Sequence, residues 1–188
     1  MQELLVDFIT SLDGYASAEG WPGWWGLEGP EYLRWLEEQP ERDYTQLMGA
    51  KTYRLMSGFA TEPPAGAGAE EADSMAELTS ASKVVFSSSL QAPLSWANTE
   101  LVRGDAVQAV REMKRTGTSP MATIGSLSLC RSLLQSGLVD RFRVERIYDG
   151  YPDVGLDMLN SRTFDGRIQL LEYAPRVLDG PPGTNAGA

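Results

Sequence analysis

The sequence contains no histidine and only one cysteine among its 188 residues. A chain without histidine cannot form a Ser-His-Asp triad, a Cys-His nucleophile pair or a histidine-rich zinc site by itself, and we predict no metal site. Any general acid must then be an aspartate, glutamate, tyrosine, lysine, cysteine or held water. Chemistry that a cofactor carries, such as hydride transfer, becomes relatively more attractive.

Basic side chains and long apolar segments are also scarce. There are 16 lysines and arginines against 26 aspartates and glutamates, a formal net charge of -10. This balance argues against an extended surface for nucleic acid or anionic membrane, although backbone N–H groups can still build a small anion site. No apolar run approaches the roughly 20 residues that span a bilayer. The N-terminus carries no signal-like segment, and the single Cys130 fits a reducing compartment. We therefore expect a soluble, cytoplasmic protein with no nucleic-acid or membrane partner.

The hydrophobic pattern predicts strand–helix units followed by two C-terminal strands. Strands are predicted over 3–10, 44–49, 83–88, 121–125 and 140–148, a strand end with a following helix over 101–117, and helices over 31–39, 50–58, 75–82 and 126–137. In the segment 157–178, Asp165-Gly166 is a strong hairpin signal. This order implies one α/β domain over 1–178, with a mostly parallel sheet and antiparallel strands at one edge. Residues 179–188 are predicted to be a flexible tail.

Two segments between these elements are predicted as loops. Residues 11–30 are rich in Gly, Trp and Pro, and loops of this length are usually functional or disordered. Three tryptophans disfavour disorder there. Residues 60–72 have low complexity and are predicted to form a mobile surface loop. The helix over 126–137 is predicted to end at Gly137 and to bury one apolar face, made of Leu127, Cys130, Leu133 and Leu134.

Three predicted strands end at small or hydroxylic residues that lead into a helix or turn, at 47–52, 85–89 and 123–126. Ligands of open α/β sheets bind outside the carboxyl ends of the strands. Helix N-termini there offer free N–H groups and a partial positive charge to phosphates. Each segment taken alone is more typical of a structural turn with an N-cap than of a phosphate site. Neither G-x-G-x-x-G nor a P-loop is present, so the common nucleotide fingerprints fail.

Three motifs carry a resemblance to a known family. T-S-L-D-G-Y-A at 10–16, L-M-G-A-K-T-Y at 47–53 and I-G-S-L-S-L-C-R-S-L-L-Q-S-G-L-V-D at 124–140 resemble the dihydrofolate reductase-like family. The chain is most similar to the reductase domain of the bifunctional riboflavin-biosynthesis deaminase-reductase and its stand-alone bacterial relatives. The resemblance covers most of 2–175 and implies a three-layer α/β/α dihydrofolate reductase-like fold. It also implies an oxidoreductase that binds NADPH and passes a hydride to a C=N or C=O bond of a small heterocyclic substrate, and a homodimer.

The resemblance assigns cofactor contacts by position. They are Ala16, Gly49, Ala50, Lys51, Thr52, Ser87, Ser88, Ser89, Gly125, Ser126 and Leu127. The two glycine segments would hold the phosphates at two helix starts. The serine turn at 87–89 would meet the adenosine ribose and its 2′-phosphate, and Ala16 would contact the nicotinamide through its backbone.

The resemblance also suggests catalytic and substrate-binding residues. Glu31 lies closest to the position of a substrate-facing carboxylate, with Glu28 next, and an apolar pocket lined by tryptophan would raise the pKa of such an acid. The alternative is that Glu31 is simply a favourable acid in the first turn of a helix. Asp13 either acts at the site or only fixes its loop. Trp24 and Trp25 are substrate walls or loop anchors, and we favour the first.

The sequence departs from the family in two places. Ala50 and Ser88 stand where relatives often carry arginine, which weakens charge-assisted recognition of a 2′-phosphate and leaves NADH as an alternative cofactor. After Val144 part of the family pattern is absent. Either that loop is deleted, or a segment is missing from the chain, and we favour the second. A non-catalytic, dimeric member that binds a nucleotide or small ligand is the competing function.

Overall fold

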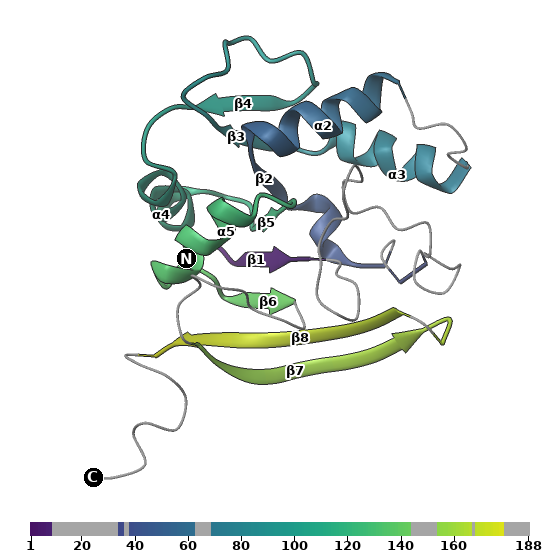
Figure 1. The fold of residues 1–188 in the computed structure, drawn as a ribbon, viewed down its shortest axis with the longest axis vertical. Helices are drawn as coiled ribbons and strands as arrows, with labels where there is room; N and C mark the ends of the chain where they lie inside the picture. The colour runs from purple at the N-terminus through teal and green to yellow at the C-terminus, as the bar shows by residue number, and fades with distance from the viewer. Residues whose placement is uncertain (9–33, 36–37, 63–68, 144–153, 167, 179–188) are drawn as a thin grey trace.

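Eight strands in the described part of the chain form one sheet with the order β4-β3-β2-β5-β1-β6-β8-β7 (Figure 1). This computed structural model describes residues 1–8, 34–35, 38–62, 69–143, 154–166 and 168–178. The elements are β1 (Leu4–Asp7), the 3-10 helix η1 (Pro40–Asp43), β2 (Thr45–Gly49), α2 (Ala50–Thr61), α3 (Ala69–Ser80), β3 (Lys83–Phe86), β4 (Thr99–Val102), α4 (Ala106–Thr116), β5 (Met121–Thr123), α5 (Leu127–Gln135), β6 (Arg141–Arg143), β7 (Val154–Phe164) and β8 (Ile168–Val177).

The sheet is parallel from β4 to β6 and antiparallel at its C-terminal edge. β1 pairs in parallel with both β5 and β6, and β2 pairs in parallel with β3 and β5. β8 is antiparallel to β6 and to β7. Asp165 and Gly166, between β7 and β8, both have positive φ, at 49° and 66°. The predicted mixed sheet and its Asp-Gly hairpin are therefore confirmed.

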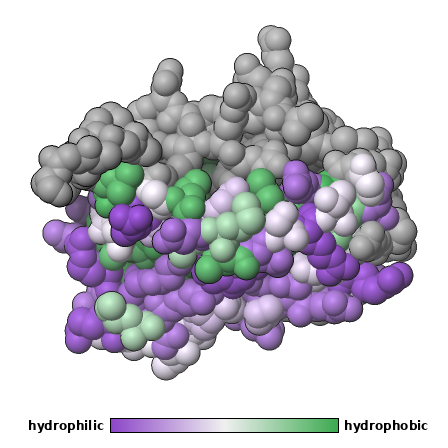
Figure 2. Space-filling model, turned by 90° about the horizontal axis from the view of Figure 1, so that it is seen from below, coloured by the Kyte–Doolittle hydropathy of each residue, from purple (hydrophilic) through white to green (hydrophobic). Residues whose placement is uncertain are grey.

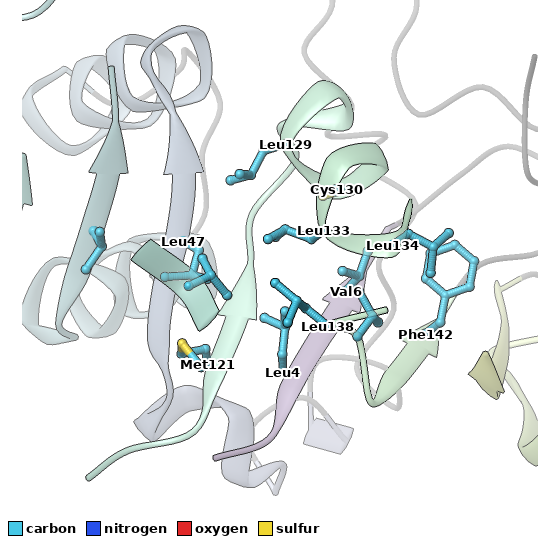
Figure 3. Packing of buried hydrophobic residues seen from close by; sticks show 13 residues of the cluster. Leu4, Val6, Leu47, Met121, Leu129, Cys130, Leu133, Leu134, Leu138 and Phe142 are labelled. Atoms are coloured by element: carbon cyan, nitrogen blue, oxygen red, sulfur yellow. The ribbon is translucent and has the colours of Figure 1, made fainter. Parts of the chain in front are cut away.

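Helices cover both faces of the parallel strands, because alternate strand residues point to opposite faces. The larger core cluster packs α4 and α5 on one face (Figure 3) and includes Leu4, Val6, Leu47, Val110, Met121, Leu133 and Phe142. The cluster on the other face packs α2 and α3 and includes Met48, Tyr53, Met75, Leu78 and Val85. These two cores give the predicted three layers, and Cys130 is buried in the first of them.

Several predicted boundaries were wrong. Helix α2 continues through Gly58 to Thr61, and α3 begins at Ala69, so both helices extend into the predicted 60–72 loop. Gly58 does not end α2 because its backbone stays helical, whereas Gly137 has a φ of +63° and does follow the end of α5. Leu127 is 46% exposed because it is the first residue of α5, and Leu129 takes its expected place in the core.

The departure predicted after Val144 falls on the connection after β6, which the described residues do not test. The strand predicted over 140–148 is present at Arg141–Arg143, and 144–153 lie outside the described residues. The tail at 179–188 also lies outside them. None of the helices in the described ranges has both the length and the apolar character needed to cross a bilayer.

Candidate functional site

Three of the predicted cofactor segments meet at one edge of the sheet. In the parallel pairing, Leu47 lies opposite Thr123 and Gly49 lies opposite Phe86. The carboxyl ends of β2, β5 and β3 are therefore neighbours. Gly49 is the last residue of β2, and Gly125 and Ser87 lie just beyond β5 and β3. This edge is where open α/β sheets bind ligands.

The segments Gly49–Thr52 and Gly125–Leu127, called the paired helix termini below, are joined through one hydroxyl group. The Gly49 N–H donates to Ser126 Oγ at 2.8 Å, and the Ser126 hydroxyl donates to Thr52 Oγ1 at 2.9 Å. Gly125 has a φ of +49°, and a Cβ there would lie 3.3 Å from Thr52 Oγ1. Glycine is required at 125 both by its backbone and by this close approach.

No described side chain caps the N-terminus of α2 or α5, and neither first turn contains an acidic residue. Ser126 is a residue type that often caps, but its φ of 60° and its bonds to α2 direct the hydroxyl away from its own helix. The first N–H groups of a helix have no partner within the helix and carry partial positive charge. The pyrophosphate of a dinucleotide, whose oxygens accept hydrogen bonds from backbone N–H groups, fits helix starts of this kind.

The serine turn is shaped by Ser87. Its Oγ accepts from the N–H groups of Ser89 and Leu90, at 3.1 Å each, while Ser88 and Ser89 are exposed. The Ser87 N–H donates to the carbonyl of Val102 at 3.2 Å, which ties the turn to the end of β4. The Ser88 and Ser89 side chains are thereby presented at the edge of the sheet.

Two arginines that sequence reasoning missed lie beside this turn. Arg103 donates to the carbonyl oxygens of Ser88, at 3.1 Å, and of Leu90, at 2.6 Å. The Arg54 guanidinium approaches Ser89 Oγ at 3.5 Å. The family motif places arginines at 50 and 88, whereas Arg54 lies four residues after Ala50 and thus one turn further on the same helix face. The turn is therefore richer in positive charge than the sequence departures suggested.

The other predicted site residues divide into two groups. Ala50 and Lys51 are the first two residues of α2; Lys51 is exposed and Ala50 is half-buried. Leu127 begins α5. Asp13, Ala16, Trp24, Trp25 and Glu31 lie outside the described residues. Their roles remain predictions from the resemblance.

A further group of polar side chains, here called the charged cluster, lies on β1, β6, β8 and η1. Its members are Glu3, Asp7, Glu41, Arg141, Arg143 and Glu172. Glu41, Arg143 and Glu172 are buried. The sequence signal was the alternation in DRFRV, which places two arginines on one face of a strand.

Arg141 anchors the interior of the charged cluster. It donates to Glu3 Oε1 at 3.1 Å and to Glu41 Oε1 at 2.8 Å, and its Nε donates to Glu172 Oε1 at 2.5 Å. Burial by itself would lower the pKa of Arg141, but its hydrogen bonds to Glu172 and Glu3 raise that pKa above the usual value. Arg141 thus links β6 to β1, η1 and β8 as a permanent cation.

The fold and the paired helix termini define a dihydrofolate reductase-like α/β/α domain. Within this class, the chain belongs to the RibD C-terminal domain family, whose sequence model matches residues 2–145. The match ends where the departure after Val144 begins. Comparison with curated proteins gives no significant match.

Solved structures share this fold at low sequence identity. A putative riboflavin biosynthesis protein from Shewanella sp. PV-4 has a TM-score of 0.64 at 17% identity, with 94% of this chain and 99% of that chain covered. A pyrimidine reductase-like protein from Corynebacterium diphtheriae has a TM-score of 0.59 at 14% identity, with 93% and 92% covered.

A two-function enzyme is also similar. The diaminohydroxyphosphoribosylaminopyrimidine deaminase/5-amino-6-(5-phosphoribosylamino)uracil reductase from Thermotoga maritima has a TM-score of 0.57 at 14% identity. The alignment covers 93% of this chain but only 57% of that one. At such identities the likeness supports the fold alone.

Proposed function

We propose that this protein is an NADPH-dependent oxidoreductase that transfers a hydride to a C=N or C=O bond of a small heterocyclic substrate. Membership of the RibD C-terminal domain family supports an oxidoreductase of the pyrimidine reductase type. The observation that carries the proposal is the pair of uncapped helix N-termini, held together by Ser126 at adjacent strand ends. The reduced nicotinamide supplies the hydride when the cofactor is bound.

The chain's own residues would bind and orient this cofactor. The first N–H groups of α2 and α5 would hold the pyrophosphate, and Gly49 and Gly125 would let it approach the backbone. Ser87–Ser89 would meet the adenosine ribose. Ala16 would contact the nicotinamide through its backbone. Glu31 or Asp13 would act as a catalytic residue. Trp24 and Trp25 would line the substrate pocket. We assign the protein to the cytoplasm on its composition.

Preference for NADPH over NADH would come from Arg54 and Arg103. Each guanidinium has five N–H donors, of which the contacts described above use one in Arg54 and two in Arg103. Guanidinium groups bind phosphate oxygens through charge-assisted hydrogen bonds. Exchange of each arginine for methionine should weaken NADPH binding about tenfold and leave NADH binding unchanged. Arg111→Met, an exposed arginine on α4, is the matched control.

Titration of the purified protein with NADPH and NADH, followed by tryptophan fluorescence and thermal shift, tests the proposal. We expect Gly125→Asp to abolish NADPH binding, because a carboxylate would face the pyrophosphate. Gly137→Asp is the control: its φ of +63° imposes comparable backbone strain, and a Cβ there meets no atom within 4 Å. If neither nucleotide binds the wild type, the reductase proposal fails.

The substrate and the competing function are separated by turnover. The pyrimidine 5-amino-6-(5-phosphoribosylamino)uracil, named for the Thermotoga maritima enzyme, is the first compound to test. Oxidation of NADPH that depends on an added pyrimidine supports the reductase. Binding of NADPH without turnover across a panel of pyrimidines and other C=N or C=O compounds would favour the non-catalytic, ligand-binding member.

We also propose a homodimer formed through the hairpin edge. β7 is the outer strand, and Met158 and Leu159 on it are 57% and 54% exposed. Figure 2 looks onto this side of the molecule and shows hydrophobic residues in a broken band across it. Among the described strands β7 has no outer neighbour, and a strand edge of this kind readily pairs with another copy. Sedimentation equilibrium should give a dimer that Leu159→Lys dissociates and Gln108→Lys on α4 does not.

A further inference from the structure

Asp7 occupies the carboxyl end of β1, one strand away from the paired helix termini. In the parallel pairing of β1 with β5, Leu5 lies opposite Ala122. Asp7 is two residues beyond Leu5, and Ile124 is two residues beyond Ala122, so the two residues lie at the same level of the sheet. Gly125 follows Ile124 directly. Asp7 also pairs with Arg143 at the end of β6. The preceding residues Val6 and Phe142 belong to the core cluster that packs against α5. The side chains of Asp7 and Arg143 therefore lie on the other face of the sheet, where Arg143 pairs with Glu41.

Asp7 is held much more loosely than the other acids of the charged cluster. Its one described contact is with Arg143 Nη1, at 3.5 Å, whereas Arg143 Nη2 donates to Glu41 Oε1 at 2.5 Å. The Asp7 side chain is 35% exposed, while that of Arg143 is 3% exposed. The described contacts therefore hold the other three acids of the cluster more closely than Asp7, whose side chain is partly exposed at the carboxyl end of β1.

The charge balance of the cluster favours a proton on Asp7. Four carboxylates face two guanidinium groups, so the cluster would carry a surplus of negative charge if every acid were ionised. Glu3, Glu41 and Glu172 each accept a bond of 3.1 Å or less from an arginine. Burial raises the pKa of Asp7, Arg143 lowers it in part, and the nearby Glu41 and Glu172 raise it again. Of the four acids, Asp7 has the longest described contact with an arginine.

We propose that Asp7 is the proton donor of the reductase and that Arg143 is its positioning residue. This inference rests on the proposed function. Asp7 would supply the proton to the substrate nitrogen or oxygen, while the hydride that the adjoining carbon receives would come from the reduced nicotinamide when it is bound. The C=N or C=O double bond becomes a single bond, the cofactor is oxidised, and Asp7 is left as a carboxylate beside Arg143. Solvent would then return a proton to the Asp7 carboxylate, which is partly exposed.

Carbon-13 NMR of the aspartate carboxyl groups tests the protonation without a substrate. Asp7→Asn assigns the resonance, and titration between about pH 3 and pH 9 measures its pKa, which we expect above the ordinary value of about 3.9. Glu41→Gln removes a neighbouring negative charge and should lower that pKa. We also expect addition of NADPH to move the Asp7 resonance, because the carboxyl lies beside the proposed cofactor site.

The stability of Asp7→Asn gives a second readout. A raised pKa means that the folded protein binds this proton more tightly than the unfolded chain does. Wild type should therefore lose stability relative to Asp7→Asn as the pH rises from the unfolded pKa through the folded pKa. Chemical denaturation at a series of pH values measures this difference. A constant difference would contradict the raised pKa.

The outcomes separate this inference from the proposed function. Titration of Asp7 at or below its ordinary pKa overturns the inference alone, as does NADPH that binds without moving the Asp7 resonance. Failure of NADPH to bind at all removes both. On a substrate that wild type reduces, Asp7→Asn should lower kcat on the order of a hundredfold. An undiminished kcat would place the proton source elsewhere, at Glu31 or at water.

Discussion

The N-terminus of α4 differs from those of α2 and α5, although all three helices begin at the same edge of the sheet. In α4, Asp105 Oδ1 accepts from the N–H groups of Val107, at 2.8 Å, and Gln108, at 3.2 Å. In α2 and α5 no described side chain does this, and the residues at the helix starts are Gly49 and Ser126. The Asp105 side chain caps α4, whereas the N-cap residues of α2 and α5 make no side-chain cap bond.

The Asp105 cap stabilises α4, whereas the N-termini of α2 and α5 lack such a cap and are the proposed phosphate site. An N-cap carboxylate stabilises a helix by about 1 kcal/mol relative to alanine but by only about a few tenths of a kcal/mol relative to glycine. With Gly49 at its N-cap, α2 therefore forgoes a small gain that α4 obtains. The N-termini of α2 and α5 follow adjacent strands, β2 and β5, and the Ser126 hydroxyl joins them. A capping acid there would repel a phosphate. The contrast predicts that an acidic N-cap added to α2 or α5 would preserve or raise the stability of the protein and weaken its nucleotide binding.

The largest effect should come from giving α2 the cap of α4. Gly49 has φ -91° and ψ 171°, a conformation any residue adopts, and the nearest atom to a Cβ there is Ser126 Oγ at 3.8 Å. We expect Gly49→Asp to keep or slightly raise the melting temperature and to weaken NADPH binding roughly a hundredfold or more, because like charges would meet. Fluorescence titration and thermal unfolding of the same sample measure both.

Gly58→Ala in the middle of α2 is the control for this variant. A Cβ at Gly58 meets no atom within 4 Å, and alanine there should stabilise the helix by up to about 1 kcal/mol. It should leave NADPH affinity unchanged. Tight NADPH binding by a well-folded Gly49→Asp protein would remove α2 from the cofactor site.

A smaller effect is expected from breaking the link between the N-termini of α2 and α5. Ser126→Ala leaves the Gly49 N–H and Thr52 Oγ1 without their partner, which should cost about 1 kcal/mol of stability and lower NADPH affinity severalfold. Urea unfolding and calorimetric titration measure the two losses. Ser132→Ala, in the next turn of α5, removes a hydroxyl that bonds only to its own helix and should change neither value much. If Ser126→Ala and Ser132→Ala have the same stability and the same NADPH affinity, the Ser126 hydroxyl does not link the two helix termini.

The smallest effect should follow from removing the cap of α4. Asp105→Ala should destabilise the protein by about 1 kcal/mol and leave nucleotide affinity unchanged, whereas Asp105→Asn should retain the cap. Thermal unfolding with and without NADPH checks both statements. A change in NADPH affinity would mean that α4 also contributes to the site, and the contrast between the helix ends would be lost.

Much of the fold could be predicted from local patterns. Asp165-Gly166 between two alternating segments identified the hairpin. A tight hairpin turn needs positive φ at both central residues, and the pair Asp-Gly adopts that conformation readily. Gly125 was recognisable because strand, glycine and helix occur in one short segment. Helix lengths were predicted less well. A glycine at 58 resembles a helix end in sequence, but neighbouring turns of α2 keep it helical.

The sequence by itself determined the strand and helix order, the glycines at the ligand edge and the absence of histidine chemistry. Only the tertiary structure decided which distant side chains meet there. Arg54 and Arg103 reach the serine turn because β3 pairs with β2 on one side and β4 on the other. Asp7 and Arg143 become neighbours because β1 and β6 align in register across 136 positions of sequence. Long-range strand pairing sets such contacts, and no local pattern records it.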